Sequence, residues 1–416
     1  MSISNPSRAT HHSASTLPGD AIVITGLGMV SSLGADVVTS CAAARAGLTR
    51  WKELDIRVTD KDTLEAVPLQ GQEITWLTHG FEGFARWLRL GDAALRDLLE
   101  YSQLGRAALP HTGIYLQLPG RLLAQTHLQS NVLSRIPEGE RARVASALAS
   151  ERAEAEAQFT RRLIPELLGL NQLSIPPRAQ AYFFGGAATF SQVLTRAMEA
   201  LRTRTLERCI VGGIDSWVDD EPLTQAYDLG LLRTPDKPVG RFPGEAAAFV
   251  LLERLDCARE RGAVIEGLLG PVASAEEKGH RFAQRPITGT ALFESISACC
   301  HPPTKQEDIG LSIINLNGDA VRAREYGHAL VRMEEAGLPA SAQRWYVAEH
   351  FGELGAATGA TAICLGVRGL VRQYARSPAI LVALLDDEPH RSAFLLRESP
   401  WRPENSPNSA THVRQS

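Results

Sequence analysis

The sequence predicts an α/β protein in which strands and helices alternate through two halves of similar layout. Short apolar runs rich in β-branched residues recur along the chain, beginning with AIVIT at residues 21–25. Segments with helical periodicity lie between them, such as residues 193–201, where apolar side chains repeat at spacings of one, three and four. Strands that alternate with helices form mixed or parallel sheets covered on both faces.

The expected elements divide near Arg261-Gly262, where the same plan starts again in shorter form. In the first half, strands are expected at 21–25, 111–118, 181–184, 209–211 and 247–252, with helices at 138–168 and 193–201. In the second half, strands are expected at 264–269, 310–316, 379–385 and 392–396, the last two as a hairpin, with helices at 291–300 and 359–374. Polar, Ser- and Pro-containing ends predict disordered tails, so the predicted domains are 1–19 (tail), 20–261, 262–398 and 399–416 (tail).

Composition excludes several function classes. The 416 residues are 44% apolar and 22% charged, with a net charge of -4, which gives no electrostatic reason to expect nucleic acid or an anionic membrane as partner. No apolar run approaches the roughly 18 residues that span a bilayer, and the first residues have no apolar signal core, so a cytoplasmic protein is predicted.

Cysteine and histidine usage predicts neither a metal site nor a cofactor. The six cysteines include no CxxC pair, which argues against a zinc site and a disulfide framework and favours buried or free thiols. His11 and His12 are neighbours in the polar tail, where a histidine pair is rarely a ligand site.

The glycine-rich segment ITGLGMVSSLG, residues 24–34, was compared with a dinucleotide-binding turn. Gly26 and Gly28 fit the G-x-G-x-x-G pattern, but Ser31 takes the third position and no acidic residue follows a second strand at the expected distance. The sequence also has no G-x-S-x-G, H-E-x-x-H or P-loop motif. These patterns disfavour a nucleotide-binding enzyme and the commonest hydrolases.

Four stretches occur in an order that identifies a family resemblance. They are AIVITGLGMVSSLG with Gly26 and Gly28, ERCIVGGIDSW with Gly212 and Gly213, RFPGEAAAF with Phe242, Gly244 and Glu245, and HFGELGAATGA with Gly355. Together they resemble the β-ketoacyl synthases. The resemblance covers residues 21 to about 396 and implies a thiolase-like, five-layered αβαβα fold with two pseudo-duplicated halves, and a dimer.

The retained motif residues have structural explanations. Gly212, Gly213 and Gly244 allow a close backbone approach that a Cβ would obstruct. Glu245 stands beside an alanine run, so it is expected to be buried and to need hydrogen-bonding partners.

The residues that the family's condensation chemistry requires are replaced. Counting from the matched motifs places Ala187 at the nucleophile, with Thr189 and Ser191 as displaced hydroxyls, and Asn317 at the first histidine. A gapless count puts Gly352 at the second histidine, whereas His350 reaches it only if the loop has gained two residues. Three carboxylates in residues 385–391 (LDDEPHR) stand where the family has a glycine-rich oxyanion loop.

These replacements predict a pseudoenzyme with no catalytic residues. The resemblance implies an adaptor or chaperone for a partner protein, because degenerate ketosynthase-like chains are associated with type VI secretion effector clusters. Two alternatives remain: a non-catalytic heterodimer partner of an active ketosynthase, similar to a chain-length factor, and a divergent acyl-thioester enzyme (an acyltransferase). The latter would use His350, Asp319 or Glu353. Residues 50–110 and 120–175 match the family poorly and are expected to carry partner-specific surface.

Overall fold

Two sets of five strands with the same internal order form the large sheet of this computed structural model, which describes residues 17–283, 285–301 and 306–401. The first set lies in the order β5-β4-β6-β7-β1 and the second in the order β10-β9-β11-β12-β8. The first three strands of each set are parallel, and the last two pairings are antiparallel. The strands are β1 (Ile22–Ser31), β4 (Thr112–Leu118), β5 (Gln180–Phe184), β6 (Arg208–Ser216), β7 (Glu245–Arg254), β8 (Gly267–Glu276), β9 (Ile309–Ile314), β10 (Gln343–Tyr346), β11 (Ala379–Leu384) and β12 (His390–Glu398).

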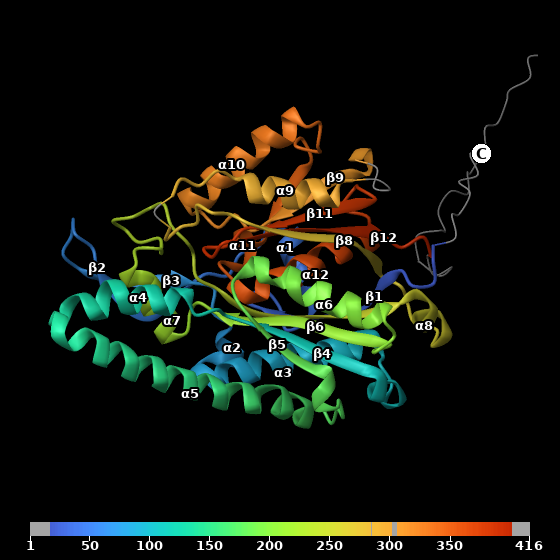
Figure 1. Cartoon of the computed structure of the whole chain (residues 1–416), viewed down its shortest axis with the longest axis horizontal. Coiled ribbons are helices and arrows are strands. Elements are labelled where there is room, and N and C mark those ends of the chain that lie inside the picture. The colour runs from blue at the N-terminus through green and yellow to red at the C-terminus, as the bar shows by residue number, and fades with distance from the viewer. Residues whose placement is uncertain (1–16, 284, 302–305, 402–416) are drawn as a thin grey trace, which may run out of the picture.

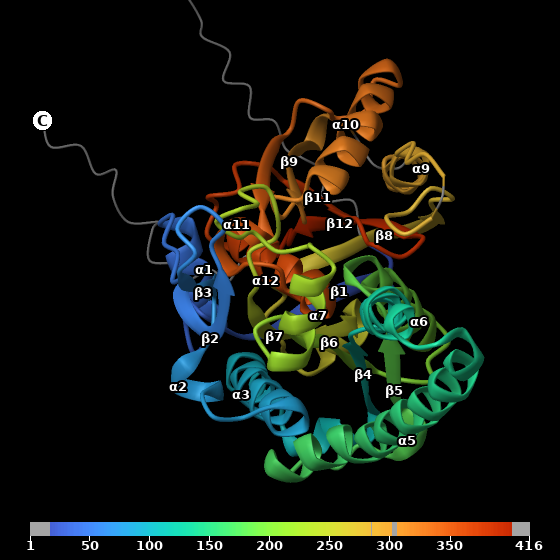
Figure 2. The same ribbon diagram turned by 90° about the vertical axis from the view of Figure 1, so that its left-hand side faces the viewer.

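The principal helices complete five layers, seen edge-on in Figure 1 and from the side in Figure 2. The outer helices are α3 (Gly83–Ser102) and α5 (Glu138–Leu170) on one side, and α9 (Thr290–Cys299) and α10 (Ala320–Glu335) on the other. The middle layer consists of α6 (Phe190–Arg202) and α12 (Thr358–Val371). Every residue of α12 but the last is buried, as expected for a helix covered on all sides. The predicted αβαβα architecture with two pseudo-duplicated halves is therefore confirmed.

The remaining elements are short. They are α1 (Val37–Arg45), β2 (Lys52–Thr59), β3 (Ala66–Gly71), α2 (Thr75–Thr78), α4 (Leu122–His127), α7 (Asp220–Asp228), α8 (Leu255–Glu260) and α11 (Val347–Phe351). No helix in the described ranges is both long and apolar enough to cross a membrane. The predicted tails and His11-His12 fall largely or wholly outside the described residues.

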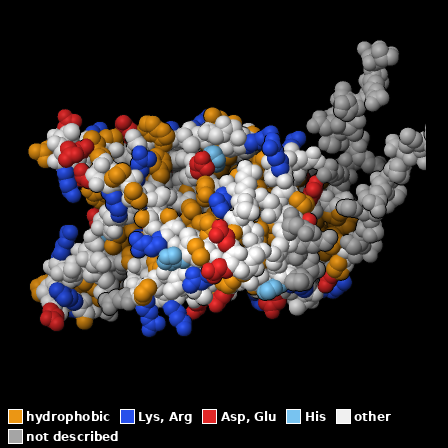
Figure 3. All heavy atoms as spheres, turned by 90° about the horizontal axis from the view of Figure 1, so that it is seen from above, with side chains coloured by type: hydrophobic (Ala, Val, Ile, Leu, Met, Phe, Trp, Pro, Cys, Tyr) orange, Lys and Arg blue, Asp and Glu red, His pale blue; other side chains and the backbone are white. Residues whose placement is uncertain are grey.

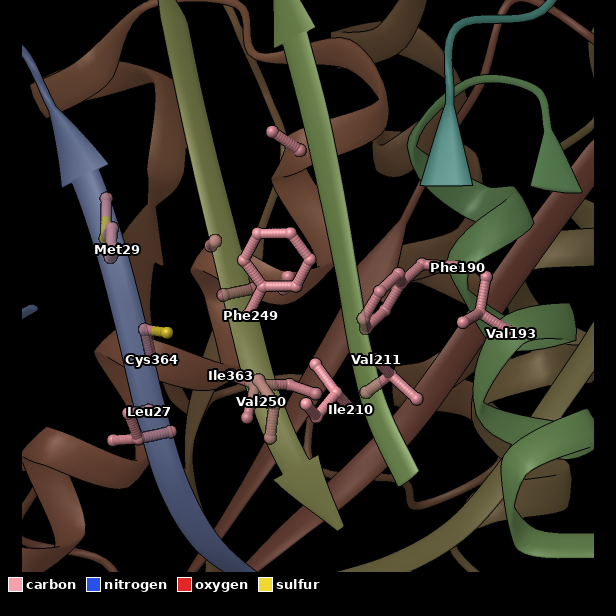
Figure 4. Close-up of a cluster of buried hydrophobic side chains, with 14 of the residues drawn as sticks. Leu27, Met29, Phe190, Val193, Ile210, Val211, Phe249, Val250, Ile363 and Cys364 are labelled. Carbon is pink, nitrogen blue, oxygen red and sulfur yellow. The ribbon is translucent and has the colours of Figure 1, made fainter. Parts of the chain in front are cut away.

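The core between the first strand set and the middle helices explains why the strands appear in the sequence as continuous apolar runs. Figure 4 shows side chains from β1, β6, β7, α6 and α12 meeting there. All ten residues of β1 and all ten of β7 are buried, because both faces of these strands are covered. The labelled contributors include Leu27, Phe249, Phe190 and Ile363.

The glycines of β1 lie within the strand, so the prediction that the strand ends in a turn at Gly26 was wrong. β1 continues to Ser31, with a register shift between Ile24 and Gly26. A Cβ at Gly28 would overlap the backbone of α3 at Ala94 and Leu98. The glycine therefore serves the close approach of helix to strand, a use that a G-x-G pattern alone does not distinguish from a turn.

Candidate functional site

The position that the family resemblance assigns to the nucleophile lies where β5 passes into α6. Ala187 begins a 3₁₀ turn (Ala187–Thr189) directly before α6 and is only 1% exposed. The hydroxyl of Ser191 donates to the carbonyl of Ala188 at 2.9 Å, and Thr189 is 2% exposed. This turn therefore presents a methyl group where a nucleophile would stand.

The cysteines supply no replacement nucleophile. All six are free and buried. Burial raises the pKa of Cys41 and of Cys299 to about 12, and raises that of Cys209 well above its usual value. Thiols of this kind stay protonated at neutral pH and are poor nucleophiles.

The loop that follows β9 carries Asn317, at the first histidine position. Its side-chain oxygen accepts from the backbone N–H of Asp319 at 3.2 Å, and its amide donates to the Glu353 carboxylate. Asp319 in turn caps α10 by accepting from the N–H of Val321 at 2.8 Å. Both polar ends of Asn317 are used in holding the loop.

The two residues considered for the second histidine position lie beside each other but not in the same environment. Gly352 has φ +75° and packs against the Phe242–Gly244 segment, where the N–H of Glu353 donates to the Phe242 carbonyl at 2.7 Å. His350 lies on α11, with its ring 6.3 Å from that of Phe351. Gly352 thus has a structural role, and His350 is not one of the residues that line the large pocket described below.

A buried ion-pair network, defined as Arg241, Arg281 and Arg322 with Asp319, Glu353 and Asp387, fills the centre between the halves. Arg241 is fully buried. It donates to Asp319 Oδ2 from Nε at 3.1 Å and to Asp387 Oδ1 from Nη2 at 2.6 Å. Arg281 contacts the same two carboxylates, and Arg322 donates to Glu353 at 2.9 Å.

The network balances three guanidinium groups against three carboxylates. Planar guanidinium groups suit this arrangement, because each presents several fixed donors to carboxylate oxygens. The surrounding arginines hold the pKa of Asp387 well below its usual range, although burial alone would raise it. Asp319 and Glu353, the candidates for a divergent chemistry, are both bound to arginines.

Three further carboxylates, Asp215, Asp386 and Glu388, lie beside the network, and no cationic group of the described residues lies within salt-bridge distance of them. We call them the unpaired carboxylates. Burial raises the pKa of Asp215 to about 7, and burial together with Asp386 and Asp387 raises that of Glu388 to about 7. Burial also raises the pKa of Asp386. The predicted acidic turn is thus present, but its Asp387 belongs to the ion pairs and its other two carboxylates do not.

A pocket of about 1040 Å³ opens above the unpaired carboxylates. Its inner end is lined by Gly185, Gly186 and Gly355 together with the three acids. Its walls come mainly from α4, α5, α7 and the segment after β4. The large apolar side chains of the lining are Trp87, Leu118, Leu122, Leu123, Leu128, Val132, Leu148, Phe159, Phe184, Trp217 and Phe282. A space large enough for an acyl chain therefore exists at this end of the fold.

The retained family motifs pack the fold around this centre. Glu245, fully buried, accepts from the Ile74 N–H at 2.7 Å, from Thr78 at 2.6 Å and from Ser216 at 2.8 Å, and lies 3.5 Å from Arg86. A Cβ at Gly212 would overlap the Phe249 ring, one at Gly213 the Ala356 carbonyl, and one at Gly244 the Phe351 carbonyl.

The arginines of the network and Asp215 were not predicted from the sequence. Arg241 directly precedes the FPGE motif, and that adjacency was the only local signal. Arg281 and Arg322 belong to segments that no motif covers, and the fold brings them together from 40 or more residues apart.

Comparison with known proteins gives similarity in structure but not in sequence. No family model matches the chain, and no curated protein matches it. A chain of a type II PKS acyl-carrier protein–ketosynthase complex (AntDE:AntF) superposes with a TM-score of 0.67 at 14% identity, covering 91% of this chain and 99% of that one. The chain has a ketosynthase fold.

Two other solved structures agree. The ishigamide ketosynthase/chain length factor superposes with a TM-score of 0.65 at 15% identity, covering 91% of this chain and 99% of its own. The oxazolomycin ketosynthase domain OzmH KS7 of Streptomyces albus JA3453 superposes with a TM-score of 0.68 at 17% identity, covering 93% and 75%. At these identities the ketosynthase fold is what the comparisons establish.

Proposed function

We propose that this chain is a catalytically inactive, ketosynthase-like scaffold that acts in the cytoplasm as an adaptor or chaperone for a partner protein. The observation that supports the proposal is the buried ion-pair network, which occupies the centre where catalytic groups would be needed. Condensation requires a nucleophile, two basic side chains and oxyanion donors. The matching positions carry Ala187, Asn317 and Gly352, which supply neither a nucleophile nor a basic side chain.

The electrostatics of the centre also oppose the reaction. An enolate or oxyanion that developed beside Gly186 would face Asp386, whose carboxylate lies against that glycine. Like charges at such distances raise the energy of the developing anion, more so in a site shielded from water. The geometry therefore disfavours even an altered thioester chemistry at this position.

Activity measurements test the first half of the proposal. The purified chain, incubated with malonyl and acyl thioesters of coenzyme A and of an acyl-carrier protein, is expected to release free thiol at the background rate. His350→Ala is the informative variant, because His350 is the one histidine near the family's position, and no change is expected. Turnover by the parent that His350→Ala abolishes would show a divergent thioester enzyme instead.

The partner is the second half of the proposal. Two exposed tryptophans, Trp51 (55% exposed) and Trp76 (57%), lie in the 50–110 region, where Lys52 and Thr75 connect their segments by a 2.5 Å hydrogen bond. Tryptophan is enriched at binding hot spots. The part of α5 before Leu163 has no fully buried residue, so the side of the helix that faces away from the pocket offers a second exposed surface.

Co-purification with each protein encoded beside this chain, including any type VI secretion effector, identifies the partner. One neighbour is expected to form a stable complex on size-exclusion chromatography with light scattering. Trp51→Ala/Trp76→Ala is expected to weaken that complex at least tenfold, whereas Val331→Ala, a matched exposed site on α10, leaves it unchanged. If the chain forms no complex with any of the co-encoded proteins, the result would count against the adaptor role.

A heterodimer partner of an active ketosynthase is the second candidate, favoured by the similarity to the ishigamide ketosynthase/chain length factor. Native mass spectrometry separates the outcomes. A homodimer, a complex with a co-encoded ketosynthase and a complex with another neighbour differ in mass. A ketosynthase complex that gains condensation activity only when this chain is present would establish the second candidate.

A further inference from the structure

The pocket above the ion-pair network combines apolar walls with an inner end lined by carboxyl groups that lie within salt-bridge distance of no cation among the described residues. Within the network, three arginines match three carboxylates, so Asp215, Asp386 and Glu388 add three acidic groups that no arginine pairs with. All three line the pocket. A buried carboxylate without a cation is costly in free energy, and a bound cation would remove that cost.

Asp386 is the group most directly available to a ligand. It is 6% exposed, and its Oδ1 accepts from the N–H groups of Asp387 at 2.7 Å and Glu388 at 3.4 Å. Its Oδ2 has no hydrogen-bond partner among the described residues. The carboxylate stands against Gly186, where the pocket reaches the turn before α6. A buried acceptor in this state is suited to a donor that enters from the pocket.

Asp215 and Glu388 extend the acidic end on either side. Asp215 accepts from the backbone N–H groups of Ala356 and Ser216, each at 2.8 Å, and from no guanidinium. Glu388 lies close to Gly120 on the opposite wall. Within the described residues, no group of three His, Cys, Asp or Glu side chains is placed to hold a metal ion. The charge therefore fits an organic cation better than a metal.

Ion pairs hold the outer wall in place. Arg121 pairs with Glu156 of α5 at 2.6 Å, and Arg152 of α5 pairs with Glu221 of α7 at 3.0 Å. These contacts connect α5 to the segment after β4 and to α7. The helix lines the pocket with Leu148, Ala155 and Phe159 and also with the charged side chains of these ion pairs. Seen from above in Figure 3, basic and acidic side chains are interspersed on this face of the molecule.

We propose that this pocket binds a small amphiphilic organic cation, with its ammonium or guanidinium group at Asp386 and its apolar chain between α4, α5 and α7. The N–H donors of such a head group would satisfy the free oxygen of Asp386 and neutralise part of the acidic end. The apolar walls would cover the chain. A fatty acid or acyl thioester of equal length would meet the carboxylates with the wrong charge, which reverses the preference that the fold alone would suggest.

Isothermal titration calorimetry of the purified full chain at pH 8 tests the site with three probes. Octylammonium is expected to bind, butylammonium to bind more weakly by roughly fourfold for each methylene that the walls bury, and octanoate to show at least tenfold lower affinity than octylammonium. Octanoate binding as tight as octylammonium would overturn the proposal, as would the absence of octylammonium binding at millimolar concentration.

Asp386→Asn locates the head group. It preserves the side-chain shape, removes the charge, and is expected to weaken octylammonium at least tenfold while leaving octanoate no weaker. Glu335→Gln, an exposed site at the end of α10, removes the same charge from the chain outside the pocket and is expected to change nothing. Equal loss in both variants would show non-specific charge attraction and refute the site. These measurements need no partner protein, so their outcome is separate from that of the adaptor proposal.

Discussion

Two adjacent carboxylates, Asp386 and Asp387, are expected to have opposite effects on stability when each is changed to asparagine. Asp387 accepts from Arg241 at 2.6 Å and from Arg281 at 2.9 Å, and lies 3.9 Å from Arg322. Asp387→Asn would leave three buried guanidinium groups with two carboxylates. Breaking a buried ion pair by removing one partner costs about 3–5 kcal/mol of unfolding free energy.

Asp386→Asn should act the other way, because Asp386 has no cationic partner within salt-bridge distance. Burial raises the pKa of Asp386, so the folded state resists its ionisation. Such a group contributes stability below its unfolded pKa, about 3.9, and that contribution is lost as pH rises through the folded pKa. The amide avoids this loss, so the variant should be at least as stable as the parent at pH 8, with the difference vanishing near pH 4.

The pH dependence of Asp387→Asn separates the two mechanisms. The pKa of Asp387 is lowered by its arginines, so its contribution is present above about pH 3.9 and is lost only as pH falls below it. The cost of Asp387→Asn should therefore be constant between pH 8 and pH 5. Urea-unfolding curves of the parent and both variants at pH 8, 6.5 and 5 provide the measurement. A cost below about 1 kcal/mol for Asp387→Asn, or equal costs for both variants, would refute the role assigned to the network.

Three further predictions follow from the same geometry. Octylammonium affinity measured by calorimetry should fall about tenfold or more from pH 8 to pH 5.5. The pKa of Asp215, which faces Glu353, and that of Glu388, which faces Asp386 and Asp387, are both about 7, so their negative charges are lost over this range. An affinity independent of pH would contradict their part in binding. Gly28→Ala should lower the free energy of unfolding by about 1–3 kcal/mol or more in thermal melts, since its Cβ would overlap α3, whereas Gly139→Ala in α5, with open space around it, should not destabilise the chain. Ala187→Cys should react with iodoacetamide at least tenfold more slowly than free cysteine and should restore no condensation activity, because the site is buried and Asp386 lies against the preceding glycine; fast labelling would show an open, activating site.

The fold could be predicted because its signals are local. Strands covered on both faces need continuous apolar runs, and the enclosed helix α12 consists mainly of small or apolar residues. Helix α6 has an apolar stripe at helical spacing, so all of these patterns are visible in the sequence. α10 was missed for a physical reason. Its buried face includes Arg322 and Glu325 beside Tyr326, Ala329 and Met333. Two charged residues in the stripe hide the apolar periodicity on which the prediction of helices depends.

The residues that stand at the positions of the family's catalytic groups could be counted from motifs, but the ion-pair network around them could not be predicted. Arg241, Arg281 and Arg322 are each about 40 residues from the next, and only the meeting of the two halves brings them to Asp387. The sequence alone indicates that the carboxylates of the acidic turn would destabilise an oxyanion. In the turn at residues 385–391, one carboxylate is paired with arginines and two are unpaired. This difference depends on distances of a few ångströms, which the spacing of residues in the sequence does not reveal.

The charged side chains at the centre favour a binding site over the remnants of a catalytic site. If the site had only to be filled after chemistry was lost, apolar side chains would serve stability as well as buried ion pairs do. The network is balanced in charge, with three guanidinium groups and three carboxylates. The unpaired carboxylates are not balanced in this way, and Asp215, Asp386 and Glu388 each disfavour folding when ionised. Residues that break local rules of stability are found mainly at functional sites, and here they gather at the inner end of one apolar pocket. A ligand that supplies positive charge would explain why they gather at this end of the pocket and why there is space above them.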